Sequence, residues 1–354
     1  MKREGYRIGD LTVSNKRYVE SKNRYFTKLS PPSTGIGVRQ LLVEGALMEV
    51  DFTALLPQEG QTLEVVSAPD VAKPGPGFAE GVKLGSWVFL SGDLPTDWQG
   101  NWGGAEYEGE VHSLAPGART NGLFWGDLPI RKQAGYLLDK LSRIAAAAGT
   151  SLDMTVKAHV YLADPTDFVG FEEVWSEWFP DKTEAPSRTI VPNVELGAKG
   201  CRVEIALDLL LPEAKHLRQA ISGGWTPKSH ESAAMRADDL VYISGLMATA
   251  ENGLAAEADL TPGLPYFGIP GKKQMEYIIA KARRICEAAD VPLEMAVKAN
   301  LYFSDLRLYA GAMEAWSELF SGSHKPAVSV LEVNRELWVP GCGILLDLVL
   351  YDPQ

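Results

Sequence analysis

The stretch LDMTVKAHVYL at residues 152–162 decides the fold, because it returns almost unchanged as LEMAVKANLYF at residues 293–303. At the same offset, EVWSEWF at residues 173–179 becomes EAWSELF at residues 314–320. Two further matches keep the same order along the chain: VFLSG at 88–92 with VYISG at 241–245, and Gly200-Cys201 with Gly341-Cys342. Similarity that recurs in a fixed order is the signature of a repeated structural unit.

A third, partial copy opens the chain. Residues 32–57 align without a gap with residues 187–212, and residues 16–26 resemble the helical stretch at 170–179. A strand pair with one apolar face is not stable alone, so this half module must dock on a full module or on another chain. The expected boundaries are 1–58 for a partial module of a helix and two strands, 59–65 for a linker, 66–212 for a full module and 213–354 for a second full module.

Each full module follows the pattern of strand, helix, strand, helix and two more strands. In the first module, residues 131–148 and 167–179 carry apolar residues at helical spacing. The stretches that favour strands are rich in β-branched and aromatic residues: 82–90, 156–162, 189–194 and 202–211. The sequence therefore predicts an α+β fold in tandem modules, each with a mixed sheet and two helices on one face.

Composition narrows the class of protein. The chain has 34 Lys and Arg against 46 Asp and Glu, a net charge of −12, and no basic run, which disfavours a nucleic-acid partner. The three cysteines and five histidines show no spacing typical of a disulfide framework or a metal site. The first ten residues are polar and no apolar run is long enough to span a bilayer, so we expect a cytoplasmic protein without a membrane partner.

Five stretches together resemble the reactive-intermediate deaminase family, also called Rid or YjgF. These stretches are GPGFAEG at 75–81, FLSG at 89–92, KAHVYLAD at 157–164, APSRT at 185–189 and RVEI at 202–205. The resemblance covers the chain from about residue 16 onward and is most specific over residues 66–212. It implies chorismate-mutase-like modules, here imitating a trimer within one chain, with sites in the clefts between modules and no cofactor. It also implies hydrolysis of imines and enamines of amino acids to keto acids and ammonia.

The resemblance assigns catalytic roles to Arg188 and Glu204. A guanidinium matches a carboxylate with two hydrogen bonds, so Arg188 would bind the substrate carboxylate. Glu204 alternates with Val203 and Ile205 and points to the opposite face of its strand, where a carboxylate could hold the attacking water and receive its proton. The plainer interpretations are an arginine in a structural ion pair and a solvated strand residue. We expect the two side chains to face one shared crevice at a module boundary.

Five further positions align with the family pattern. Two of them carry the family's residue, and three carry a different one. Ser91 and Gly92 form the family's Ser-Gly turn, although such a serine more often caps a turn than binds a ligand. Phe78 replaces the usual tyrosine, Ile190 the usual cysteine, and Glu172 the usual asparagine of the helix. We expect all five near the substrate.

The other copies of the site depart further from the family pattern. In the half module, Ser33 stands at the arginine position, while Glu49 keeps the glutamate. In the last module, Val328 stands near the arginine position and Leu345 at the glutamate position. We therefore expect fewer working clefts than modules, with the degenerate copies forming the opposite walls.

Several functions are compatible with these features. The first is a cofactor-free hydrolytic deaminase of imine or enamine carboxylates, in a specialised form acting on 2-aminomuconate, a dianion that Arg188 could bind together with Arg39 or Arg202. The alternatives are a chorismatase-like hydrolase, a non-catalytic binder of small carboxylates, and RNA cleavage, which the acidic charge disfavours. We also expect a homo-oligomer with an even number of chains, because two half modules could then pair around a two-fold axis.

Overall fold

The computed structural model divides into two compact units. The first contains Met1–Gly37, Phe52–Lys182 and Val194–Arg218, and the second contains Val38–Asp51, Thr183–Asn193 and Gln219–Gln354. The residues that the structure describes are 11–27, 29–75, 77–98, 114–121, 123, 126, 128–224, 227, 229–260, 263–264 and 267–353.

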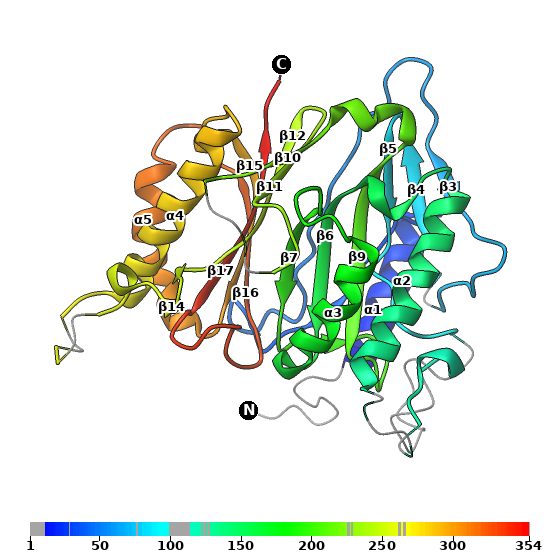
Figure 1. The fold of residues 1–354 in the computed structure, drawn as a ribbon, viewed down its shortest axis with the longest axis horizontal. Coiled ribbons are helices and arrows are strands. Elements are labelled where there is room, and N and C mark those ends of the chain that lie inside the picture. Colours follow the sequence, from blue (N-terminus) through cyan, green and yellow to red (C-terminus); the bar gives the residue numbers. More distant parts are fainter. Residues whose placement is uncertain are drawn as a thin grey trace. The chain divides into compact units, whose positions relative to one another are not determined.

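The described part of the first unit contains a hairpin, three α-helices and two long central strands. Figure 1 shows helices α2 and α3 side by side over one face of these strands. The elements are α1 (Leu11–Tyr25), β1 (Ile36–Gly37), β3 (Glu64–Val66), β4 (Gly81–Leu84), β5 (Trp87–Leu90), α2 (Pro129–Ala147), β6 (Thr155–Leu162), α3 (Phe168–Trp178), β8 (Glu195–Leu196) and β9 (Val203–Leu210).

Apolar periodicity explains how this layer packs. Helix α2 begins with Pro129 in its first turn, and it is followed by Gly149, which has a φ of 87° that disfavours other residues. Alternate residues of β9 are fully buried, from Val203 to Leu209. Since successive side chains of a strand point to opposite faces, this alternation directs Glu204 to the face opposite these apolar residues.

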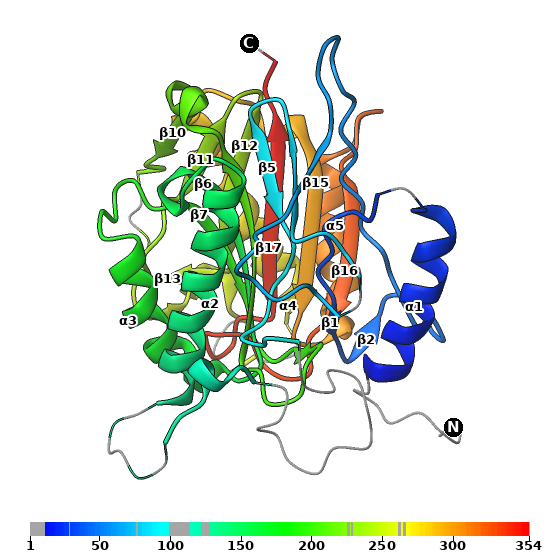
Figure 2. The ribbon, with the colours of Figure 1, turned by 90° about the vertical axis from the view of Figure 1, so that its right-hand side faces the viewer.

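The second unit repeats the same succession of elements. Its apolar core lies between a sheet and helices α4 and α5, and in Figure 2 these helices lie behind the strands. The elements are β2 (Gln40–Leu41), β7 (Ser187–Val191), β10 (Arg218–Ile221), β11 (Ala234–Ala237), β12 (Leu240–Leu246), β13 (Thr249–Ala250), β14 (Gly253–Leu254), α4 (Pro270–Ala288), β15 (Ala296–Phe303), α5 (Tyr309–Leu319), β16 (Ala327–Glu332) and β17 (Ile344–Tyr351).

The two main sheets share one strand order. It reads β3-β4-β5-β9-β6 in the first unit and β10-β11-β12-β17-β15 in the second, where β16 and β2 follow. The register agrees as well, because Tyr161 lies opposite Glu204 and Tyr302 lies opposite Leu345. Antiparallel pairs and the parallel pair β15–β16 occur in one sheet. The prediction of an α+β fold in tandem modules with mixed sheets is confirmed.

The half module differs from expectation in its second strand. Residues 48–55 align with β9, but the structure has no strand between residues 42 and 63. The physical reason is pairing: β9 has β5 and β6 at its two edges, whereas the half module contains no counterpart of either strand. Several large apolar side chains of this segment are exposed as a result: Leu47, Met48, Val50, Phe52, Leu55 and Leu56.

Candidate active site

The Ser91-Gly92 turn of the first unit is covered by the N-terminal half module. Ser91 Oγ donates a 2.5 Å hydrogen bond to Ala79 O and accepts one of 3.0 Å from Ser33 N. Gly92 N donates a 3.0 Å hydrogen bond to Thr34 Oγ1. Residues 33 and 34 are thus fixed against the turn by consecutive contacts.

Glu204 lies directly beside this turn. Its Oε1 would be only 2.5 Å from a Cβ atom added to Gly92, so a glycine is needed there to admit the carboxyl group. The backbone N–H of Gly35 donates a hydrogen bond to the Glu204 carboxylate, whereas Oε2 accepts none from any residue that the structure describes. The side chain is 3% exposed, but Thr34 and Gly35 above it are exposed. The carboxyl group therefore lies one layer below the surface.

The electrostatic environment shifts the protonation equilibrium of Glu204 toward the neutral carboxyl group. Burial raises the pKa of Glu204 from 4.5 to about 8, with a further increase from the nearby Asp93 carboxylate, and the Gly35 hydrogen bond acts in the opposite direction. Such a group can donate a proton at pH 7 and accept one shortly above it.

Helix α1 presents two polar side chains to the same segment. Tyr18 OH lies 3.1 Å from Ser33 Oγ, and Lys22 Nζ donates hydrogen bonds to Ser30 Oγ at 2.7 Å and to Gly77 O at 3.3 Å. Lys22 is 4% exposed, and burial lowers its pKa. Residues four apart share a helix face, so this face of α1 is directed at the segment that also contacts Ser91 and Glu204.

Arg188 belongs to an equivalent turn in the second unit. Its backbone N–H donates a 2.9 Å hydrogen bond to Ser244 Oγ, which in turn donates one of 2.6 Å to Ser232 O. This repeats the contacts of Ser33 with Ser91. The guanidinium is fully buried, and its Nε lies 3.1 Å from Glu231 Oε2, a carboxylate that stands at the repeat position of Phe78.

A second buried carboxylate near this turn was missed by sequence reasoning. Asp347 is 2% exposed and accepts a 2.6 Å hydrogen bond from Thr189 Oγ1. Asp347 follows Leu345 by two residues and therefore shares its strand face, so the second unit carries an acid one step along from the glutamate position. The available signal was a single acidic residue within the otherwise apolar strand ILLDLVL.

The remaining predicted residues lie in varied surroundings. Phe78 is half-buried, with its ring 6.2 Å from that of Trp98 in an edge-to-face arrangement. Ile190 is buried, Glu172 is half-buried on α3, and Glu49 is exposed in the segment that forms no strand.

The structure gathers Glu204, Ser91, Gly92 and Ser33 in the first unit, and places Arg188 with Ser244 in the second. The expected meeting of Arg188 and Glu204 in one crevice therefore stays a prediction.

The two arginines considered for a second carboxylate already have acidic partners. Arg39 lies 3.0 Å from Glu332, and its own side chain is largely exposed. Arg202 lies 2.6 Å from Asp167. A dianionic substrate would have to compete with these carboxylates.

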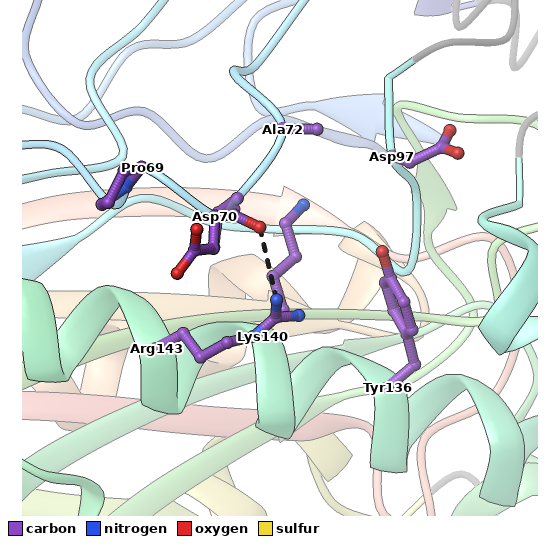
Figure 3. Close-up of a pocket in the computed structure, with 8 residues that line it drawn as sticks. Pro69, Asp70, Ala72, Asp97, Tyr136, Lys140 and Arg143 are labelled. Atoms are coloured by element: carbon purple, nitrogen blue, oxygen red, sulfur yellow. Dashed lines mark hydrogen bonds between the residues drawn. The ribbon is translucent and has the colours of Figure 1, made fainter.

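A separate cavity of about 380 Å³ lies in the first unit beside α2. Figure 3 shows Tyr136, Lys140 and Arg143 of this helix on one side, with Asp70 and Asp97 on the other. Lys140 Nζ donates hydrogen bonds to Asp93 Oδ1 at 2.8 Å and to Thr96 O at 3.0 Å. These bonds fix the loop that follows the Ser91-Gly92 turn, so we assign Lys140 a structural role.

Within the described ranges, no group of three or more His, Cys, Asp or Glu side chains is arranged to hold a metal ion. Among the helices that the structure describes, none is both long enough and apolar enough to cross a bilayer.

Comparison with known proteins identifies the family. A family model described as endoribonuclease L-PSP matches residues 68–209 and 226–338, one segment in each full module. A RutC family protein of Sulfurisphaera tokodaii is 28% identical over 145 residues, which are 41% of this chain and 96% of that protein. A protein of Dermatophagoides farinae named 2-iminobutanoate/2-iminopropanoate deaminase is 26% identical over 141 residues, 40% of this chain and 91% of that protein. The solved structure of RidA from an Antarctic Psychrobacter is 26% identical, with a TM-score of 0.31; the match covers 42% of this chain and 99% of the RidA chain.

The family model matches more than half of the chain, once in each repeat. The chain therefore belongs to the endoribonuclease L-PSP family, the same family as the YjgF and Rid proteins.

Proposed function

We propose that the chain is a cofactor-free hydrolytic deaminase of imine and enamine carboxylates, and that the first unit carries the reaction at Glu204. The observation that carries this proposal is a buried carboxyl group with one oxygen, Oε2, that accepts no hydrogen bond from the described residues. The relative named as a deaminase of 2-iminobutanoate and 2-iminopropanoate supports the reaction class.

The reaction needs one group that moves a proton twice. Water adds to the carbon of the protonated imine, C=NH2+, and loses a proton to the Glu204 carboxylate, so the nitrogen becomes the neutral amine of a carbinolamine. Glu204 returns that proton to the amine and the C–N bond breaks. The hydroxyl group then becomes the carbonyl of the keto acid, and its proton passes to the released ammonia, which leaves as ammonium. A pKa of about 8 makes both protonation states of Glu204 accessible near neutral pH.

The surrounding groups would orient the reactants. Thr34 and Gly35 form the exposed cover of the carboxyl group, so a small substrate could approach from their side. The hydrogen bonds from Ser33 and Gly92 hold this cover in place. Fixed orientation of water and substrate supplies much of the rate in reactions of this type.

For Arg188 we keep the role that the family resemblance implies, binding of a substrate carboxylate, and propose it for the second unit. Its Nε already has Glu231 at 3.1 Å, so an incoming carboxylate would bind through the other N–H groups of the guanidinium or displace Glu231. A specialised role with 2-aminomuconate stays part of the proposal, in competition with the simple imines.

An assay across substrate classes tests the reaction. We expect the purified protein to accelerate ammonia release from 2-iminopropanoate, generated in the assay by an amino-acid oxidase, above the uncatalysed rate. 2-Aminomuconate and chorismate are compared in parallel. Consumption of chorismate alone would favour a chorismatase-like hydrolase. Tight binding of carboxylates without turnover would favour a binding protein. Either result would contradict the proposed deaminase activity.

We also propose that the protein assembles with an even number of chains. Residues 48–55 match β9 in sequence, and their apolar side chains are exposed in the single chain. A second copy would present the same segment, and two such segments can pair antiparallel across a two-fold axis.

A further inference from the structure

We propose that Lys22 supplies the cationic contact for the substrate's carboxylate in the first unit, at the site where Ser33 stands in place of the family's arginine. The inference rests on the proposed function, because it names the group that holds the substrate beside Glu204. Four observations lead to it.

The first observation is a buried ammonium group whose described hydrogen-bond acceptors are neutral. Lys22 is 4% exposed, and both oxygens that accept its hydrogen bonds, Ser30 Oγ and Gly77 O, are uncharged. None of the carboxylates in the described part of the chain forms an ion pair with it. Burying a charge without an opposite charge is costly, so this arrangement favours an anionic ligand that completes the site.

The second observation is the place of Lys22 in the repeat. When the first helix is aligned with α3 on Phe26 and Phe179, Lys22 falls at the position of Trp175. Trp175 is fully buried and belongs to the apolar face of α3. A lysine at the position of a core tryptophan has no packing advantage.

The third observation is the path from Lys22 to Glu204. Lys22 contacts Ser30, and Tyr18 on the same helix face contacts Ser33. The residues that follow each make one contact with the reaction site, since Ser33 binds Ser91, Thr34 binds Gly92 and Gly35 binds Glu204. Ser30, which Lys22 contacts, and Gly35, which contacts Glu204, are five residues apart in one segment, so this segment connects the two side chains.

The fourth observation is the contact with Gly77. Gly77 precedes Phe78, which stands at the family's tyrosine position, and Ala79 O accepts the hydrogen bond from Ser91 Oγ. Lys22 therefore contacts the loop whose Ala79 accepts the hydrogen bond from Ser91. Together the contacts place a cation between the loop at Gly77 and the segment that ends at Gly35.

Pyruvate and its neutral amide, pyruvamide, serve as probes in calorimetric titrations. We expect Lys22→Met to weaken pyruvate binding at least tenfold and to leave pyruvamide binding unchanged, because only pyruvate carries the charge. Lys22→Arg should retain pyruvate binding within a few-fold, and Ser33→Arg should restore it in the Lys22→Met protein. Arg24→Met, an exposed position on the same helix, is the matched control and should bind pyruvate like the wild type.

Stability separates a binding role from a structural one. Since Lys22→Met removes a buried charge without a carboxylate partner, the variant should unfold at an equal or higher denaturant concentration than the wild type. Loss of stability or failure to fold would mean that the ammonium group is structural and would overturn the inference. Unchanged pyruvate binding would overturn it as well.

The failure of this inference and that of the deaminase reaction give different results. If pyruvate binding depends on Lys22 but the wild type releases no ammonia, the reaction is wrong and the anion site stands. If Lys22→Met releases ammonia with wild-type KM and kcat, the reaction stands and the inference is wrong. The expected outcome is a raised KM for 2-iminopropanoate with a much smaller change in kcat.

Discussion

The backbone N–H of Ser33 donates a 3.0 Å hydrogen bond to Ser91 Oγ and so joins the N-terminal half module to the turn of the first full module. The same bond recurs from Arg188 to Ser244 in the second unit, at 2.9 Å. One docking geometry is thus used twice, with a serine at the arginine position in one case and the arginine in the other. The chemical difference between the two sites therefore arises from side chains rather than from backbone geometry.

Gly92→Ala should impair catalysis more than stability. The added Cβ would lie 2.5 Å from Glu204 Oε1 and 2.6 Å from Thr34 Oγ1, so both side-chain ends would have to move away from the site. We expect a loss of activity of at least about tenfold, since catalysis is sensitive to small displacements, with little change in the denaturation midpoint. Gly322→Ala, where the new atom meets nothing within 4 Å, is the control; equal activity in both variants would contradict the assigned geometry.

The pKa of Glu204 predicts a pH dependence of stability. The folded chain keeps this proton up to about pH 8, whereas the unfolded chain loses it near 4.5. The folded state binds more protons between these values, so the contribution of Glu204 to the unfolding free energy falls as pH rises through this window, by at most about 1.4 kcal/mol per pH unit. Urea denaturation of Glu204→Gln between pH 5 and 8 should show a shallower decline than the wild type; parallel declines would argue against the raised pKa.

The buried pair of Arg188 and Glu231 should be sensitive to the loss of one partner. Glu231→Gln removes the carboxylate 3.1 Å from a fully buried guanidinium, so we expect a destabilisation of about 3 kcal/mol. The exposed pair of Lys272 and Glu318 offers a comparison, and Glu318→Gln should cost far less. Chemical denaturation measures both, and similar losses in the two variants would contradict a buried pair.

The exposed segment at residues 48–55 should control assembly. Phe52 is 69% exposed there, and Phe52→Asp would place a charge on the apolar side of the proposed strand pair. Light scattering should give an even multiple of the chain mass for the wild type and a single-chain mass for the variant. Leu123→Asp, at a position that is 91% exposed outside this segment, should leave the mass unchanged; a wild-type monomer would refute the assembly.

The sequence repeat predicted most of the fold, because the spacing of apolar residues indicates which face of each helix or strand is buried. The helix expected at residues 167–179 is α3 (Phe168–Trp178), and the strand expected at 202–211 is β9 (Val203–Leu210). The missing strand of the half module could not be foreseen in the same way, because a strand sequence forms a strand only where a partner edge exists.

The site was predicted only in part, because contacts between segments far apart in sequence leave no local pattern. Glu204 stood out through its alternation with Val203 and Ile205. The burial of Lys22 depends on α1 reaching Gly77, 55 positions along the chain, and a lysine on a polar helix gives no sign of that. Nor did the sequence indicate that Arg188 and Glu204 would be grouped in different compact units.

The most direct test of the central claim is the rate of ammonia release from 2-iminopropanoate by Glu204→Gln. The variant keeps the shape of the side chain and removes its titratable proton, so we expect a fall of 10²-fold or more, as is typical for a lost general acid–base group. Glu177→Gln, on the exposed side of α3, should retain the wild-type rate. A Glu204→Gln protein that releases ammonia as fast as the wild type would contradict the account.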